Sequence, residues 1–232
     1  MKLKKHGKLT IKRGKKHTFV GMDIEFMENR KVKITLEDYI KECIDDFKDD
    51  VEATATTPAD KGLFVINEYS PKLSKEKHEN FHSIVAKLLF VSKRARLDIV
   101  LTIAFLCTRV SRSTEQDWRK LLRLLKYLQG TTDLPRIIGA NNLHMMKTWV
   151  DAVYAVHHDM KSHTEGVMSF GTGVLNAKSA KQKLNTKSST EAELVGSSGY
   201  IPWTLWVKRF MKYQGYDIKS SIFYQDNESG KW

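Results

Sequence analysis

Two β-rich runs open the pattern of apolar and polar positions, and a helical pattern follows them. Residues 19–26 (FVGMDIEF) and 31–35 (KVKIT), separated by the polar stretch 27–30, predict a β-hairpin with Gly21 at a bulge. Thr35 then precedes a helical pattern over 36–47, for which it is a suitable cap. The acidic residues between 45 and 52 are contiguous on a polar helix end, and they predict a solvated surface rather than metal ligands.

The middle of the chain has the spacing of helices. Residues 53–71 are rich in Thr, Ala, Pro and Gly and predict a loop, while the almost wholly apolar segment 99–110 predicts a buried element. A helix begins near Ser113, capped by Ser113 with Gln116 or by Thr114 with Asp117, and ends at Gly130. Between the loop at 53–71 and the segment 99–110 lies an apolar stripe at helical spacing that predicts a packed core, formed by Phe81, Ile84, Val85, Leu88 and Leu89.

From about His144 the pattern changes to strands. Residues 146–156 predict a strand on which Trp149, Asp151 and Val153 share one face. Residues 167–170 and 174–177, separated by Gly-Thr-Gly at 171–173, predict a hairpin. A helix from about Thr190 and a strand at 222–225 complete the order β-β-β-α-β. The expected fold class is therefore α+β, with a helical region before the sheet.

Three acidic residues in different settings are the candidate chemistry. Asp151 lies in an apolar strand, Glu193 near a helix start and Asp226 at a strand end. A carboxylate on an otherwise apolar face is costly unless it is paired or binds a metal, and three gathered carboxylates suit divalent cations. Two of these acids also fit purely local roles. From the residues alone, Thr190 to Glu193 is better explained as a capping box, and Asp226 before Asn227 is a common turn opening.

The order of several sequence blocks resembles the end of copia-type LTR-retrotransposon Pol polyproteins. The blocks are HSIVAKLLFVSKRARLDIVLTIAFL, STEQDWRKLLRLLKYLQGTTD, VDAVYA, DMKSHTEGVMSF, KSAKQKLNTKSSTEAEL and YQDNES, of which SSTEAEL is the most specific. The resemblance implies the end of a reverse transcriptase palm with its following helix at 1–52, a helical connection region at 53–143, and an RNase H-like domain with a mixed sheet at 144–232. It places Phe19, Val20 and Gly21 in a primer-grip-like position.

The resemblance also implies a reaction, the two-metal hydrolysis of RNA in RNA–DNA hybrids. Asp151, Glu193 and Asp226 would be the catalytic ligands of two Mg²⁺ (or Mn²⁺) ions, with Asp151 bridging both. Glu193, which precedes Leu194, is the ligand in the family's pattern, and Glu191 points elsewhere. The expected partners are an RNA–DNA hybrid or other nucleic acid, and the rest of the polyprotein. No small-molecule cofactor and no membrane are expected.

Basic residues support a nucleic-acid partner. The formal net charge is +12, and eight bases fall between Met1 and Lys16 without one acid. This run suits phosphate contacts or is a solvated tail, and the two interpretations weigh equally. A second basic stretch precedes the predicted helix start, where it would bind strand phosphates or form a solvated loop. Its candidate nucleic-acid-binding residues are Lys178, Lys181, Lys183, Lys187, Ser189 and Thr190.

Composition narrows the class of protein further. No run of 18 apolar residues occurs, and the N-terminus is polar and basic, so an intracellular location, cytoplasmic or nuclear, is expected rather than secretion. Cys43 and Cys107 have neither disulfide nor zinc spacing and are expected to be buried free thiols. His157, His158 and His163 lie close together but also lack the spacing of a zinc site.

Several departures from the family's pattern bear on activity. Val153 stands where an acid is frequent, and the chain ends six residues after Asp226, before the remaining helices, last strand and fourth acid of the family. The paired-aspartate motif of the polymerase is absent upstream, which excludes a polymerase acting alone. We therefore expect a truncated RNase H-like domain with weak or no activity. The alternatives are a catalytically dead, nucleic-acid-binding relic and a folded remnant without activity.

Overall fold

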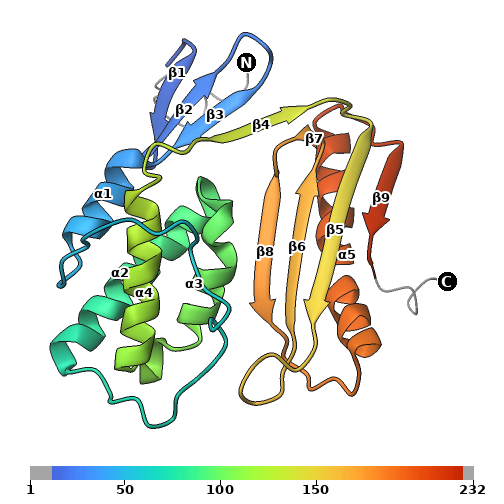
Figure 1. Ribbon diagram of the computed structural model, residues 1–232. Helices are drawn as coiled ribbons and strands as arrows, with labels where there is room; N and C mark the ends of the chain where they lie inside the picture. Colours follow the sequence, from blue (N-terminus) through green and yellow to red (C-terminus); the bar gives the residue numbers. More distant parts are fainter. Residues whose placement is uncertain (1–11, 227–232) are drawn as a thin grey trace, which may run out of the picture.

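The computed structural model describes residues 12–226 of the chain, which form a helical half and a sheet half joined by a second sheet (Figure 1). One sheet has five strands in the order β1-β2-β3-β4-β7, and the other has four in the order β8-β6-β5-β9. The buried hydrophobic side chains fall into two clusters, a large one among the helices and a smaller one between the four-stranded sheet and helix α5.

The N-terminal strands are β1 (Lys16–Phe19), β2 (Met22–Phe26) and β3 (Val32–Thr35). The predicted hairpin between 22–26 and 32–35 is confirmed, with Ile24 opposite Ile34. The prediction of one strand over 19–26 is wrong. Val20 and Gly21 both have positive φ, +51° and +74°, and form a two-residue hairpin turn rather than a bulge. Phe19, Val20 and Gly21 thus lie at an exposed turn.

Strand β4 (Arg136–Ala140) lies in a part of the chain for which the sequence predicts a helical region, so that prediction is wrong at its end. The strand pairs with β3, Ile34 lying opposite Arg136, and on its other side with the two-residue strand β7 (Gly171–Thr172). The predicted Gly-Thr-Gly turn is therefore partly a strand. This sheet ties the first residues of the described chain to the four-stranded sheet.

The helical half contains α1 (Glu37–Asp45), α2 (Lys75–Arg94), α3 (Val100–Cys107) and α4 (Glu115–Gln129). Short 3-10 helices η2 (Leu97–Ile99) and η3 (Val110–Arg112) flank α3. Thr35 does not cap α1, because it ends β3, and Leu36 is the N-cap. The alternative of Thr114 with Asp117 is confirmed for α4, where the Thr114 amide donates to Asp117 Oδ2 over 2.9 Å.

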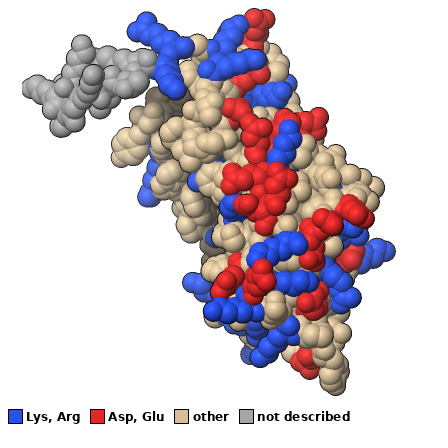
Figure 2. Space-filling view, turned by 90° about the vertical axis from the view of Figure 1, so that its left-hand side faces the viewer, with Lys and Arg blue, Asp and Glu red and all other residues tan. Residues whose placement is uncertain are grey.

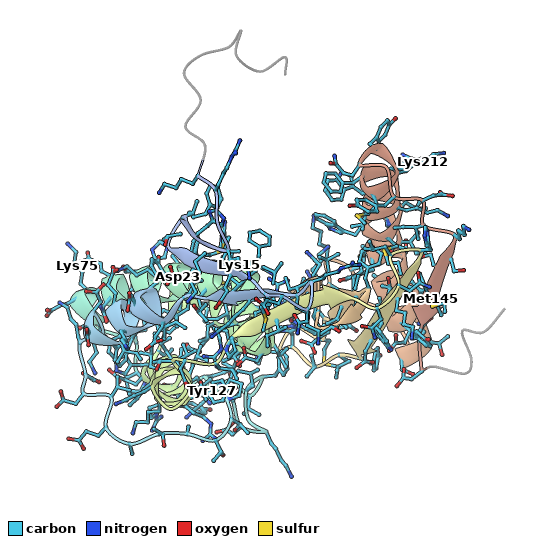
Figure 3. The ribbon with its side chains drawn as sticks, turned by 90° about the horizontal axis from the view of Figure 1, so that it is seen from above. Lys15, Asp23, Lys75, Tyr127, Met145 and Lys212 are labelled. Atoms are coloured by element: carbon cyan, nitrogen blue, oxygen red, sulfur yellow. The ribbon has the colours of Figure 1, made fainter. Side chains whose placement is uncertain are left out.

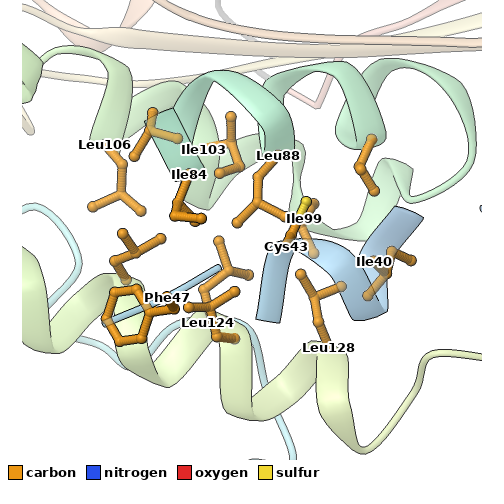
Figure 4. Close-up of a cluster of buried hydrophobic side chains, with 14 of the residues drawn as sticks. Ile40, Cys43, Phe47, Ile84, Leu88, Ile99, Ile103, Leu106, Leu124 and Leu128 are labelled. Atoms are coloured by element: carbon orange, nitrogen blue, oxygen red, sulfur yellow. The ribbon is translucent and has the colours of Figure 1, made fainter. Parts of the chain in front are cut away.

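The helices enclose the larger core (Figure 4). The segment 99–110 is largely buried, as predicted, whereas Leu89 is 39% exposed and not part of the core stripe. Cys43 is fully buried, and burial raises the pKa of its thiol to about 12, while Cys107 is only partly buried. A buried ion pair, Arg109 Nε to Asp117 Oδ1 at 3.0 Å, fixes η3 against the start of α4.

The acidic end of α1 lies on the face shown in Figure 2, where acidic side chains gather near the middle and basic side chains lie mostly above and below them. Lys87 forms ion pairs with Glu42 and Asp46, and Lys48 pairs with Glu76. These exposed carboxylates are neutralised locally by lysines of the same face. Asp45, Asp50 and Glu52 form no ion pair within the described residues, and their exposure agrees with the predicted solvated surface.

The four-stranded sheet consists of β5 (Met145–Val153), β6 (His163–Ser169), β8 (Asn176–Lys181) and β9 (Ser220–Tyr224), with α5 (Ser189–Tyr213) before the last strand. β6 and β8 are antiparallel to their neighbours, and β9 is parallel to β5. The expected fold class, α+β with a mixed β-β-β-α-β sheet, is confirmed. Several strand boundaries were wrong. β5 ends at Val153, near the left-handed residue Ala155 (φ +50°), β6 begins at His163 rather than at 167, and β8 covers Asn176–Lys181 rather than 174–177.

Helix α5 covers one face of this sheet, and a glycine allows its close approach. A Cβ on Gly166 of β6 would lie 2.2 Å from the ring of Tyr200 of α5, which is 2% exposed. The opposite face, which carries Asp151, leaves Trp149 39% and Val153 48% exposed. Asp151 shares its face with Trp149 and Val153, as predicted. This face is exposed because α5 packs on the other face, that of Val150 and Ala152.

A buried histidine pair joins the two halves. His157 Nε2 and His163 Nδ1 are 3.0 Å apart, and His163 Nε2 is 2.6 Å from Ser179 Oγ. Their rings pack against Phe64, with centroids 5.1 and 5.4 Å away. Burial lowers the pKa of both histidines to about 4, so each is neutral at pH 7. His158 instead points outward and lies 2.8 Å from Glu68.

Among residues 12–226, no helix combines the length and the hydrophobicity that crossing a lipid bilayer requires.

The close approach at Gly166 gives a prediction about stability. Gly166→Ala places a methyl carbon 2.2 Å from the Tyr200 ring, so α5 must move away from the sheet. We expect a loss of about 1–3 kcal/mol in the free energy of unfolding. The matched control is Gly199→Ala in α5, where an added Cβ meets nothing within 4 Å, so stability should be unchanged or raised. Urea unfolding of both variants measures the difference. Equal stabilities of the two variants would contradict the packing.

The histidine pair gives a prediction about pH. Between pH 6.5 and about 4 the unfolded chain binds protons at His157 and His163 that the folded chain does not, so stability falls as pH falls through this window. We expect a loss on the order of 3 kcal/mol, measured by urea unfolding at several pH values. The double variant His157→Gln, His163→Gln should lose much of this dependence, and His158→Gln should keep it. A wild-type stability that is flat over this range would refute the buried neutral pair.

Candidate metal centre

Three carboxylates from separate parts of the chain converge at one end of the four-stranded sheet. Asp151 comes from β5, Glu193 from the first turns of α5 and Asp226 from the residues just after β9. One oxygen of each lies within 4.8 Å of an oxygen of each of the others. Asp151 and Asp226 are exposed, and Glu193 is 4% exposed. The structure therefore brings together the three acids that the sequence singled out.

The parallel pairing of β5 with β9 explains how Asp151 meets Asp226. Trp149 is opposite Tyr224 in this pair, and their rings stack with centroids 5.1 Å apart. Each aspartate follows two residues later on its own chain segment. Asp151 is on the face of the two aromatic rings because side chains alternate along a strand. Asp226 lies just past the end of β9 and lines the same hollow as Asp151 and both rings. The strand register thus sets the separation of these carboxylates.

Glu193 is held in place by two hydrogen bonds from the sheet. The Ala152 amide donates to Oε1 over 2.8 Å, and Gln225 Nε2 donates to Oε2 over 3.1 Å. The capping role predicted for Glu193 from the residues alone is wrong. Ser188 is the N-cap and accepts from the Glu191 amide, and the carboxylate of Glu191 accepts from the Lys187 amide over 2.6 Å.

The surroundings of Glu193 favour its neutral form. Burial raises the pKa of its carboxyl group, and the nearby charge of Asp151 adds to the effect, while the bonds from Ala152 and Gln225 oppose it. No lysine or arginine forms an ion pair with any of the three carboxylates within residues 12–226. Clustered carboxylates without a cationic side chain are a suitable set of hard oxygen ligands for Mg²⁺ or Mn²⁺.

Glu165 is a fourth acid near the site, and the sequence patterns did not indicate it. It lies directly opposite Asp151 in the β5–β6 pair and lines the same open hollow, of about 530 Å³, as Asp151 and Asp226. Burial and the charge of Asp151 raise its pKa. The hairpin register was the signal that could have revealed it, but the predicted strand began at 167, four residues too late, and left Glu165 out.

The predicted phosphate-binding residues lie on β8 and in the loop that leads to α5. Lys178, Lys183 and Lys187 are exposed, whereas Lys181 forms an ion pair with Asp159 at 2.7 Å. Ser189 and Thr190 form the first turn of α5, close in sequence to Glu193. The structure thus leaves three of these lysines accessible to solvent.

The N-terminal basic run lies mostly outside the described residues, which begin at 12. Within them, Lys15 pairs with Glu28 at 2.8 Å and Lys16 with Glu25 at 3.8 Å. Lys12 and Arg13 are exposed.

Comparison with known proteins identifies relatives among transposon proteins. No protein-family model matches the sequence, and no solved structure matches it. Over 206 residues the chain is 26% identical to a retrovirus-related Pol polyprotein from transposon TNT 1-94 of Nicotiana tabacum, a match that covers 87% of this chain and 15% of that protein. Over 187 residues it is 24% identical to a putative transposon Ty5-1 protein of Saccharomyces cerevisiae, covering 80% of this chain and 60% of that protein.

A third relative is a retrovirus-related Pol polyprotein from transposon RE2 of Arabidopsis thaliana, 28% identical over 127 residues, which are 53% of this chain and 9% of that protein. The chain spans less than two thirds of the length of each of these relatives. These matches confirm the similarity to retrotransposon Pol polyproteins that the sequence blocks indicate.

Proposed function

We propose that this chain is the part of a retrotransposon Pol polyprotein in which the end of the reverse transcriptase is followed by an RNase H-like domain, and that this domain hydrolyses RNA in RNA–DNA hybrids. The observation that carries the proposal is the convergence of Asp151, Glu193 and Asp226 within 4.8 Å on a β-β-β-α-β sheet. The similarity to Pol polyproteins supports the same assignment.

The residues of the cluster would divide the work of holding two divalent cations. Asp151, on β5 between β6 and β9, would contact both ions, and Glu193 and Asp226 would each complete one side. When bound, two such ions activate a water for attack on a phosphodiester and stabilise the leaving oxygen. Ala152 and Gln225 hold Glu193 with both oxygens in fixed positions, which reduces the reorganisation that binding requires.

The surroundings of the cluster suit a large polyanionic substrate. The hollow beside the carboxylates is open to solvent and continues onto the exposed sheet face with Trp149 and Tyr224. Lys183 and Lys187 lie on the loop before α5 and would contact strand phosphates. Selection of RNA would rest on contacts to the 2′-hydroxyl across a shallow minor groove. A catalytically dead relic that only binds nucleic acid is the alternative, and it differs in binding a hybrid without cleaving it.

Cleavage of a labelled RNA–DNA hybrid by the purified chain in Mg²⁺ or Mn²⁺ tests the reaction. Asp151→Asn removes the shared ligand and should lower the rate by at least about 100-fold, because a misplaced metal misplaces the reacting groups. Glu191→Gln changes the neighbouring acid, which only caps the helix, and should retain the rate. Cleavage that is undiminished in Asp151→Asn places the chemistry elsewhere. Hybrid binding without cleavage by the wild-type chain favours the relic.

Metal binding tests the role of Gln225 as a positioning residue. Gln225→Met removes the donor to Glu193 Oε2, which raises the pKa of that carboxyl further and frees one oxygen. We expect Mn²⁺ affinity, measured by calorimetry, to fall by about 10-fold or more, with a deficit that becomes smaller as the pH rises and fewer protons compete for the carboxylate. Gln214→Met, at the exposed end of α5, is the matched control. A pH-independent deficit would contradict the proton competition.

A further inference from the structure

A groove lined by basic side chains runs along α4, where the segment 53–65 crosses the helix. Two hollows of about 490 and 460 Å³ adjoin there, and both are lined by Arg119 and Arg123. Lys120 lines the first and Lys126 the second. The segment 53–65 forms the opposite wall, anchored by hydrogen bonds such as Arg123 to Thr57 Oγ1 at 2.9 Å. We call this surface the α4 groove.

The charges of the α4 groove are not neutralised by neighbouring acids. Within the described part of the chain, Arg119, Arg123 and Lys126 take part in no ion pair. Lys120 donates instead to the carbonyl groups of Leu63 and Val65 at 2.8 and 2.6 Å. Asp60 is the acidic residue among those that line the two hollows. Lys48 and Lys87, near α1, are by contrast paired with carboxylates.

The spacing of these bases matches a repeating anion. Arg119, Arg123 and Lys126 follow one another at four and three residues, so they lie along one side of α4 over about 10 Å. Successive phosphates of one duplex strand advance about 3.4 Å along the helix axis, so this row covers roughly three of them. Two of the three bases are arginines, whose planar donor fork binds phosphate oxygens in pairs. A single small anion would leave most of this row without a partner.

Helix α4 and the sheet face that carries Asp151 lie on the same side of the molecule. Figure 3 shows α4, at Tyr127, and the end of α5, at Lys212, on opposite sides. In Figure 1 the strands of the four-stranded sheet lie in front of α5, and α4 lies in front of α2. The sheet face that α5 leaves uncovered, which carries Asp151, therefore looks toward the side on which α4 lies.

We propose that the α4 groove binds the phosphate backbone of the nucleic acid whose scissile strand enters the carboxylate cluster. The choice of ligand rests on the proposed function, while the surface itself rests on unpaired charge and geometry. The helical half would then hold the substrate as well as support the sheet. Because phosphate contacts release counterions, the contribution of the α4 groove is measurable as a salt dependence.

The test compares two triple variants of the full chain with equal charge changes. The first is Arg119→Gln, Arg123→Gln, Lys126→Gln in the α4 groove. The control is Lys208→Gln, Arg209→Gln, Lys212→Gln, which removes three exposed bases from α5 on the opposite side. Affinity for a labelled RNA–DNA hybrid is measured in EDTA over a range of NaCl concentrations, so that no metal chemistry contributes. Thermal unfolding of each variant reports on folding.

We expect the groove variant to lower the slope of log affinity against log salt by roughly 2–3 and the control to leave it nearly unchanged. Equal reductions in both variants, or none in the groove variant, would overturn the proposal. If the groove variant does not fold, Arg119→Lys, Arg123→Lys keeps the charge and should retain the salt slope. Binding in EDTA is measured without any metal held by the carboxylate cluster. If the chain binds the hybrid through the α4 groove but does not cleave it, the result counts against the proposed reaction alone.

Discussion

The contact between α5 and the middle of the four-stranded sheet is the constraint on which the carboxylate cluster depends. The helix reaches this depth because Gly166 has no side chain and Tyr200 occupies the space. Only at this depth does Glu193 come within hydrogen-bonding distance of the Ala152 amide. The strand register alone brings Asp151 and Asp226 together, so the third carboxylate is the one that helix packing must supply.

This arrangement concentrates electrostatic cost at the cluster. Burial and the charge of Asp151 both disfavour ionised Glu193, and Glu165 on the neighbouring strand is affected in the same direction. Two hydrogen bonds from the sheet offset part of this cost. A site that is assembled against its own repulsion is a site that a divalent cation stabilises on binding. The helical half is tied to this sheet by β4 and by the contact of Phe64 with the buried histidines, so a substrate held there would be presented in a fixed orientation.

Local patterns in the sequence predicted much of this fold, whereas the elements that depend on contacts between distant residues were not predicted. The Thr114–Asp117 cap, the buried segment after residue 99 and the β-β-β-α-β order follow from spacing along the chain. Strand β4 and the two-residue β7 are stable only through each other and β3, so no local pattern marks them. The convergence of the three acids was predictable from resemblance rather than from residue patterns, which favoured a capping role for Glu193. The roles of Gln225 and Glu165 depend on register, which the sequence did not define.

Anomalous scattering from crystals grown with Mn²⁺ tests the central claim most directly. We expect Mn²⁺ between Asp151, Glu193 and Asp226, with Gln225 still bonded to Glu193 and with the ions at carboxylate–metal distances of about 2.0–2.3 Å. The same crystals of Asp151→Asn should show the peak lost or strongly reduced. Mn²⁺ bound elsewhere, or three carboxylates that turn apart toward solvent in its presence, would contradict the assignment of a metal centre.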